Sequence, residues 1–162
     1  MRAVTNSSIL IALSTIGQLS LLHQRFPDGV FLPQAVWREV VETGKGQPGA
    51  QDVASASWLT IRQVTNTSLI SLLKIELDEG EAEAIALFAE NPVDAILLDE
   101  KNARRAARQM GLPVLGTVGI LIWAKQKGLI ITLKEQLDTL QNQGNFRISQ
   151  SLYQKALNRV GE

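Results

Sequence analysis

Short apolar runs of strand length alternate along this chain with segments of helical periodicity. We expect strands at residues 3–5, 29–32, 58–64, 95–98 and 113–115. We expect helices over residues 7–14, 18–25, 33–42, 79–90, 101–110 and 117–127, and two more from residue 133 onward, separated by Gln143-Gly144-Asn145. Because strands separated by helices favour a parallel sheet with helices on both faces, the pattern indicates an α/β fold with about five strands.

The length of 162 residues predicts one domain with a core large enough to fold without disulfides. The glycine-rich stretch at residues 43–49 reads as a flexible loop within that domain rather than as a boundary. We expect residues 1–130 to form the core of the domain and residues 131–162 to form a C-terminal helical extension.

Composition limits the kinds of site that the chain can build. Cysteine is absent and His23 is the only histidine, so thiolate sites and histidine-rich zinc sites are excluded. Any metal would rest on oxygen ligands, which favours Mg²⁺ or Mn²⁺ over zinc. Sixteen basic and sixteen acidic residues balance, whereas a protein that only coats nucleic acid is usually more basic.

The chain shows no membrane or export signal. The N-terminus has one charge and then a polar interruption at residues 5–8, unlike a signal peptide. No apolar run approaches the roughly 20 residues that span a bilayer. These features predict a cytoplasmic protein that does not enter a membrane.

The segment LDEGEAEAIALFAE holds acidic residues that a helical wheel separates. At about 100° per residue, Glu81 falls in line with the bulky core residues, whereas Glu83 points the opposite way and is expected to face solvent. A carboxylate at the start of a helix is favoured by the helix dipole. That reading explains Glu83 well but Glu81 poorly, because a carboxylate on an apolar stripe needs a partner or a metal.

Three further candidates come from other segments. Asp99 follows the apolar run Ile96-Leu97-Leu98, where it could cap the next helix or bind a metal, and Glu100 could replace it as the ligand. Glu39 shares a stripe with apolar residues of its helix. Thr117 follows the last expected strand, where its hydroxyl could cap a helix or contact a metal-bound water.

Asn6 follows the first expected strand, at a position where a carboxylate would read as a metal ligand. The carboxyl ends of parallel strands are where such sheets bind ligands. Asn6, Glu81, Asp99 and Thr117 would gather there. Converging carboxylates suit a hard divalent cation, which could activate water and neutralise charge in phosphodiester hydrolysis.

A basic group follows Asp99 in the chain. Lys101, Arg104, Arg105 and Arg108 are expected on one helical face, with Ala103, Ala107 and Met110 largely on the other. Such a face is often only solvated, and the alternative is contact with a nucleic-acid backbone. His23 and the three tryptophans are expected to serve packing.

Several segments resemble the DUF3368 group of PIN-like proteins: VTNSSILIAL, LPQAVWREVV, LDEGEAEAIALFAE, ILLDEKNARRAARQMGLPVLGTVGILIWAKQKGLI and LDTLQNQGNFRISQSLYQKAL. The resemblance covers nearly the whole chain in order. It implies a three-layer α/β/α fold with a central parallel sheet. It places the acidic site on Asn6, Glu39, Glu81 and Asp99, with Thr117 beside it, although the first of these positions is usually aspartate in PIN domains.

The resemblance implies a ribonuclease dependent on Mg²⁺ or Mn²⁺, with Glu39, Glu81 and Asp99 as metal ligands. It also implies RNA as substrate, a cognate antitoxin protein as partner and possible homodimers. Asn6 offers an oxygen without charge, which weakens the site and leaves two alternatives open. One is a PIN-like domain that binds RNA or protein without cutting, and the other is a small-molecule phosphohydrolase, which would need a closed pocket.

Overall fold

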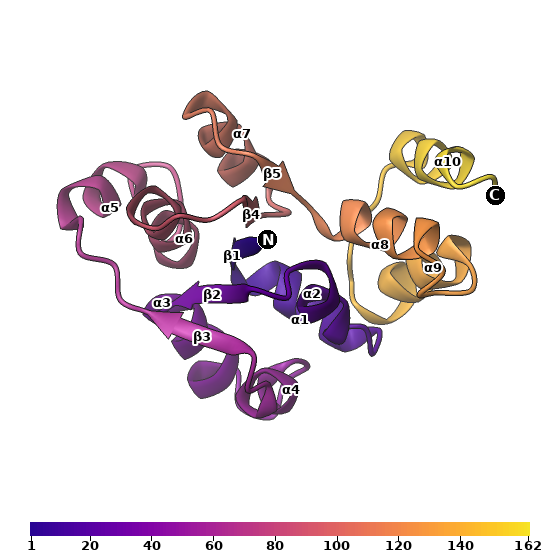
Figure 1. Cartoon of the computed structure of the whole chain (residues 1–162), viewed down its shortest axis with the longest axis horizontal. Helices are drawn as coiled ribbons and strands as arrows, with labels where there is room; N and C mark the ends of the chain where they lie inside the picture. The colour runs from indigo at the N-terminus through magenta and orange to yellow at the C-terminus, as the bar shows by residue number, and fades with distance from the viewer.

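A five-stranded, fully parallel sheet forms the centre of the molecule (Figure 1). The computed structural model describes residues 1–162. The strand order is β3-β2-β1-β4-β5. The strands are β1 (Arg2–Thr5), β2 (Gly29–Pro33), β3 (Leu59–Arg62), β4 (Ala95–Leu97) and β5 (Val114–Leu115). The α/β/α fold predicted from the sequence is therefore confirmed.

Alternate strand residues pack into two separate hydrophobic cores, one on each face of the sheet. The larger core takes Ala3, Val30 and Leu97, and the smaller takes Val4, Phe31 and Ile96. Because successive side chains of a strand point to opposite faces, strands buried on both sides must be apolar throughout. This requirement explains the short apolar runs of β1, β2 and β4, whereas the more exposed edge strand β3 includes Thr60 and Arg62.

Helices cover both faces of the sheet. The smaller core is covered by α6 and α7, and the larger by the helices from α1 to α4 and from α8 to α10. The helices are α1 (Ser7–Thr15), α2 (Ser20–Arg25), α3 (Gln34–Trp37), α4 (Ala50–Ser55), α5 (Thr67–Leu73), α6 (Glu79–Glu90), α7 (Lys101–Gln109), α8 (Thr117–Gln126), α9 (Leu133–Gln143) and α10 (Gln150–Arg159).

The sequence did not predict α4 or α5. Each is short, with six and seven residues, and α5 buries none of its residues completely. The apolar periodicity that identifies a helix needs a longer window than these segments supply. The first turn of α5 is stabilised by Asn66, whose side chain accepts a hydrogen bond from the Leu69 amide at 3.1 Å.

The expected helix over residues 33–42 divides into two parts. α3 gives way to a π-helical segment, η1 (Arg38–Thr43). The segment ends at Gly44, where a side chain would not fit, because a Cβ at Gly44 would lie 2.6 Å from the Val40 carbonyl oxygen. Wide turns of this kind often occur at functional sites. Here the wide turn carries Glu39.

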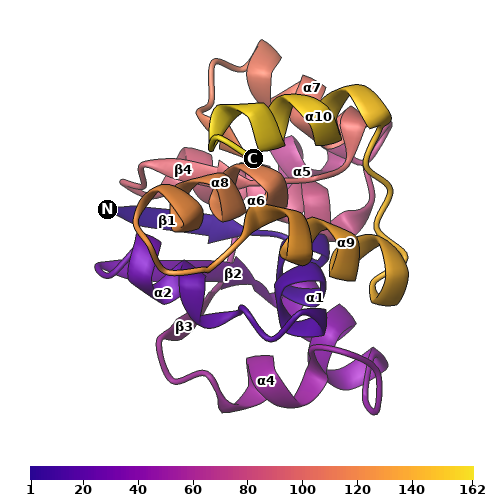
Figure 2. The same cartoon turned by 90° about the vertical axis from the view of Figure 1, so that its right-hand side faces the viewer.

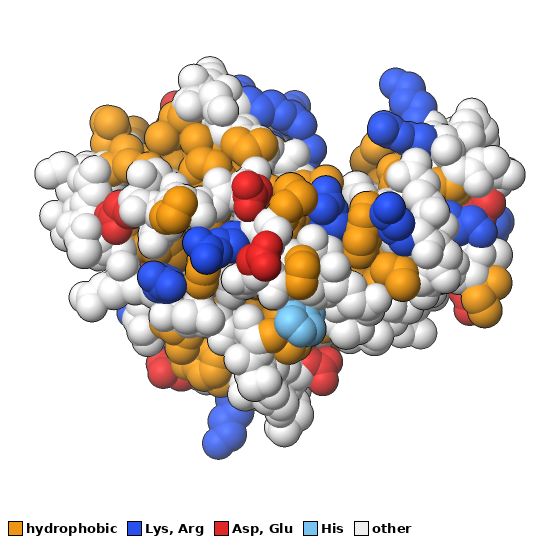
Figure 3. Space-filling view, viewed as in Figure 1, with side chains coloured by type: hydrophobic (Ala, Val, Ile, Leu, Met, Phe, Trp, Pro, Cys, Tyr) orange, Lys and Arg blue, Asp and Glu red, His pale blue; other side chains and the backbone are white.

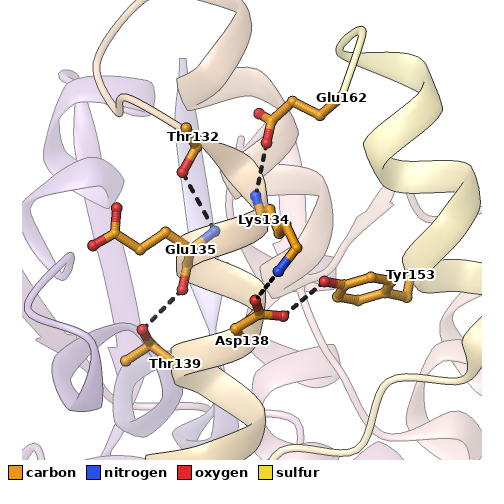
Figure 4. A network of polar contacts seen from close by, with 7 residues as sticks. All are labelled: Thr132, Lys134, Glu135, Asp138, Thr139, Tyr153 and Glu162. Atoms are coloured by element: carbon orange, nitrogen blue, oxygen red, sulfur yellow. Dashed lines mark hydrogen bonds and ion pairs between the residues drawn. The ribbon is translucent and has the colours of Figure 1, made fainter.

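The C-terminal helices belong to the main body of the protein. α9 and α10 lie beside α8 in Figure 2, and α9 buries Leu133, Leu137 and Leu140 in the larger core. Polar contacts join the two helices to each other and to the end of the chain (Figure 4). Asp138 accepts hydrogen bonds from Lys134 at 2.6 Å and from Tyr153 at 2.7 Å. Glu162 accepts from the backbone amides of Leu133 and Lys134.

His23 and the three partly buried tryptophans have packing roles, as expected. His23 stacks on Trp58 with ring centroids 5.4 Å apart, and all three tryptophans pack against the larger core. Hydrophobic, acidic and basic side chains are interspersed on the face shown in Figure 3, with hydrophobic ones gathered over α5.

None of the helices has both the length and the apolar character that a membrane span requires.

Candidate functional site

A hollow of about 440 Å³ lies where β1 and β4 end and where α1, α6 and α7 begin. Five of its side chains are carboxylates and only one, Lys101, is a cation. The residues that line it are Asn6, Ser7, Ser8, Ile11, Glu39, Glu76, Asp78, Glu81, Glu100, Lys101 and Asn102. We call this the acidic hollow. It brings together Asn6, Glu39 and Glu81 of the residues predicted from the sequence, and it leaves out Asp99 and Thr117.

Asn6 joins β1 to α1 and is buried. Its side-chain oxygen accepts a hydrogen bond from the Ile9 amide at 3.4 Å, which caps the first turn of α1. The backbone amide of Asn6 donates to the Leu97 carbonyl at 3.3 Å and so connects β1 to β4. Because asparagine and aspartate cap helices about equally well, asparagine keeps the structural part of this position while removing its charge.

Glu39 reaches the acidic hollow from η1. Ser7, at the start of α1, donates a hydrogen bond of 2.6 Å to Glu39 Oε2. The first turn of α6 also lies close, because a Cβ at Gly80 would be 3.3 Å from the same oxygen. The absence of a side chain at Gly80 therefore leaves room for the carboxylate of Glu39 between α1 and α6.

Glu81 takes part in a reciprocal cap at the start of α6. Asp78 Oδ1 accepts from the Glu81 amide at 2.8 Å, and Glu81 Oε1 accepts from the Asp78 amide at 3.5 Å. Burial, followed by the neighbouring Asp78 and more weakly by Glu100, raises the pKa of Glu81 to about 7. Like charges that crowd one another in this way would be relieved by a bound cation.

Replacing Glu81 with glutamine is expected to remove part of the pH dependence of stability. A folded-state pKa of about 7 lies above the ordinary 4.5, so the stabilisation from the bound proton is complete below pH 4.5 and lost as the pH rises through 7. The free energy of unfolding of the variant, relative to that of the wild type, should therefore rise by about 1 kcal/mol between pH 5 and pH 8. The effect is this small because water screens the partly exposed side chain. Urea unfolding in EDTA measures the difference.

The matched control for that experiment is Glu42→Gln. Glu42 is exposed in the same π-helical segment as Glu39 and does not line the acidic hollow. Its replacement should change the free energy of unfolding by less than about 0.5 kcal/mol, as surface substitutions do. A Glu81→Gln difference that stays constant from pH 5 to pH 8 would contradict the raised pKa.

Asp99 is bound to Thr117. Asp99 Oδ1 accepts from the Thr117 amide at 2.8 Å, and Oδ2 accepts from the Thr117 hydroxyl at 2.6 Å. Asp99 thus satisfies the start of α8, not of the helix that follows it in sequence. Burial raises the pKa of Asp99, and the two hydrogen bonds from Thr117 oppose that shift. A Cβ at Gly116 would lie 2.9 Å from Asp99 Oδ1, so this packing requires glycine.

Removing the Asp99 side chain is expected to destabilise the protein. Asp99→Ala leaves the Thr117 amide and hydroxyl without their acceptor and should cost about 2 kcal/mol in the free energy of unfolding. Asp99→Asn should cost less than about 1 kcal/mol, because its amide oxygen can accept from the Thr117 amide while the Thr117 hydroxyl rotates to accept from the new NH₂ group. Denaturant unfolding of both variants tests this, and equal stabilities of Asp99→Ala and the wild type would contradict it.

Glu100 is the acidic residue after β4 that lines the acidic hollow. It occupies the position before α7, and its side chain makes no capping hydrogen bond. The sequence left Asp99 and Glu100 as alternative ligands. The structure places Glu100 at the acidic hollow, whereas Asp99 lines a neighbouring hollow and accepts hydrogen bonds from Thr117 with both of its oxygens.

Glu83 differs from its sequence-based prediction. It was expected to face solvent, but it is half-buried, its carboxylate accepts from the Ala35 amide at 3.4 Å, and burial raises its pKa. The helical wheel failed here because α3 packs against α6 and covers the side of α6 that carries Glu83. Glu83 thus serves the start of α3, and it does not line the acidic hollow.

The basic residues of α7 do not share one environment. Lys101 lines the acidic hollow, whereas Arg104 is half-buried and donates to the Leu98 carbonyl at 2.8 Å. Arg105 and Arg108 are exposed. Ala103 and Ala107 are buried as predicted, but Met110 is 41% exposed because α7 ends before it. The expectation of one continuous basic face is therefore wrong for Arg104.

Two acidic residues of the hollow were missed by sequence reasoning. Asp78 stands three positions before Glu81, and an aspartate at that spacing is a recognisable capping signal. Glu76 lies between α5 and α6, where no local pattern marks it.

The donor set of the acidic hollow suits a hard cation. Its carboxylate, amide and hydroxyl oxygens are the ligands that Mg²⁺ and Mn²⁺ prefer. No three Asp, Glu, His or Cys side chains lie close enough together to form a complete metal-binding group. Mg²⁺ usually keeps several waters and takes only one or two protein carboxylates, so the residues fit an open, partly hydrated site.

A protein-family model described as a PIN domain, DUF3368, matches residues 2–162. The match extends over all the strands and helices, including the C-terminal helices. No curated protein and no solved structure matches the chain.

Proposed function

Because this chain belongs to the DUF3368 family of PIN domains, we propose that it is a metal-dependent endoribonuclease whose active site is the acidic hollow. The observation that carries the proposal is the convergence of five carboxylates on one hollow at the carboxyl ends of parallel strands. PIN domains are nucleases in general and use divalent metal ions. The crowded carboxylates, with the pKa of Glu81 raised to about 7, favour the same chemistry.

We assign the binding of a partly hydrated Mg²⁺ or Mn²⁺ to one or two carboxylates of the acidic hollow, drawn from Glu39, Glu81 and Glu100. When bound, such an ion neutralises charge on a phosphodiester and makes a water molecule more acidic. Ser7 fixes the orientation of Glu39, and the cap formed with Asp78 fixes that of Glu81. Lys101 stands at the same hollow and supplies a positive charge for a phosphate oxygen.

The direct test is cleavage of a panel of single-stranded RNAs by the purified full chain. We expect cleavage with Mn²⁺ or Mg²⁺, none in EDTA, and recovery when the metal is returned. Absence of cleavage with either ion across the panel would overturn the proposal.

A non-cleaving domain that binds RNA or protein is the second candidate, supported by two observations. Asn6 brings no charge to the acidic hollow, and no complete metal-binding group is formed. This candidate predicts binding of RNA without cleavage, and it predicts that Asn6→Asp switches cleavage on. A small-molecule phosphohydrolase is less well supported, because the acidic hollow shares a wall with a second hollow instead of closing around a ligand.

The role of toxin with a cognate antitoxin, in the cytoplasm, completes the proposal. Exposed Leu72, Ile75 and Met110 border a hollow of about 460 Å³ between α5 and α7. Exposed apolar patches of this kind are typical of protein contacts, which supports a protein partner. Induced expression of the wild type should arrest growth, whereas Glu39→Gln should not. Growth unaffected by the wild type would contradict the toxin role.

A further inference from the structure

A second hollow of about 430 Å³ continues the acidic hollow toward the C-terminal helices. The two share Ser8, Ile11 and Glu100, so they form one groove across the start of α1. The far wall of the second hollow is made by Gly144, Asn145, Phe146 and Arg147, which lie between α9 and α10. Figure 2 shows this connecting segment on the same side of the molecule as α1.

The connecting segment is held in place on both sides of Arg147. The amide of Phe146 donates to the Leu140 carbonyl at 3.3 Å, and its ring packs against the larger core. Ile148 is buried, and its carbonyl accepts from Gln141 Nε2 at 3.3 Å. The backbone of Arg147 is therefore fixed by two anchored neighbours, while its own side chain is exposed.

Arg147 is the basic residue of the second hollow, as Lys101 is of the acidic hollow. Its guanidinium makes no ion pair within the protein, and it is the only basic side chain that lines the second hollow. Where no cation is bound, the carboxylates of the groove would repel the phosphates of a nucleic-acid strand. A guanidinium offers paired donors that match the oxygens of a phosphate.

We propose that Arg147 binds a backbone phosphate of the RNA strand next to the one that is cleaved, so that the strand lies along the groove from the acidic hollow to the C-terminal segment. This proposal rests on the nuclease function proposed above. Contacts of this kind position a strand without reading its sequence. The C-terminal helices thereby contribute directly to substrate binding.

The test measures RNA binding separately from cleavage. Binding of a fluorescent 12-nucleotide single-stranded RNA to the full chain is followed by anisotropy in EDTA, over a series of salt concentrations. The variants are Arg147→Ala, Arg147→Lys and, as a matched control, Arg159→Ala. Arg159 is likewise exposed and without an ion pair, and it lies in the last turn of α10, outside both hollows.

We expect Arg147→Ala to weaken binding about tenfold and to reduce the slope of log K against log salt by about 0.7, as the loss of one phosphate contact on a single strand requires. Arg147→Lys should keep the slope, and Arg159→Ala should match the wild type. An Arg147→Ala slope equal to the wild-type slope, or no RNA binding by the wild type, would overturn this inference. Failure of the nuclease proposal would instead appear as bound RNA that stays uncut with Mn²⁺.

Discussion

Replacing Glu39 with glutamine is expected to lower metal-dependent RNA cleavage by about a hundredfold or more, the size typical for the loss of one electrostatic contact at a reacting centre. Glutamine keeps an oxygen that can accept the hydrogen bond from Ser7, so the local packing should persist. Only the charge that would hold the cation is removed. Single-turnover cleavage with saturating RNA measures the effect.

The control for Glu39→Gln is again Glu42→Gln, which removes one charge from the same helical segment outside the acidic hollow. It should retain cleavage within about twofold of the wild type, as surface charges distant from the chemistry do. Both variants should unfold at the same denaturant concentration as the wild type, within error. Wild-type activity in Glu39→Gln would exclude Glu39 from the metal site.

The second large effect separates two neighbouring carboxylates. Glu100→Gln is expected to reduce cleavage about a hundredfold, because Glu100 lines the acidic hollow and its charge is not used by any capping bond. Asp99→Asn should lose less than about tenfold, because Asp99 lines the second hollow instead of the acidic hollow and holds the start of α8 through Thr117.

Cleavage by the two variants is compared over a Mn²⁺ titration. Glu100→Gln should require a higher Mn²⁺ concentration for half-maximal activity, whereas Asp99→Asn should keep the wild-type value. The reverse order would show that Asp99 leaves Thr117 to bind the metal, and it would return Asp99 to the ligand position that the family resemblance gave it.

The fold could be predicted from the sequence because its main elements have strong local signals. β1, β2, β4 and β5 are apolar runs, and α6 combines a cap with a long apolar stripe. The two helices of the C-terminal part are likewise bounded by visible signals, with Gly144 just after α9. Elements of six or seven residues, such as α4 and α5, lack enough periodicity to be recognised.

The site was only partly predictable, because its details depend on contacts between distant segments. Asn6 and Glu81 from the sequence pattern, and Glu39 from the family resemblance, line the acidic hollow, and their role there stays a prediction. The sequence could not decide between the adjacent residues Asp99 and Glu100. Asp99 is hydrogen-bonded to Thr117 and Glu100 lines the acidic hollow, and the sequence reveals neither contact. The burial of Glu83 depends on α3 packing against α6, and no pattern within the sequence of α6 reveals that neighbour.

Diffraction from crystals of the full chain soaked in Mn²⁺, recorded at the manganese absorption edge, tests most directly whether the acidic hollow holds the catalytic cation. We predict an anomalous peak within coordination distance of a carboxylate oxygen of Glu39 or Glu100, and no such peak in Glu39→Gln crystals. An enzyme that cleaves RNA in solution but shows its only manganese peak outside the acidic hollow would contradict the account.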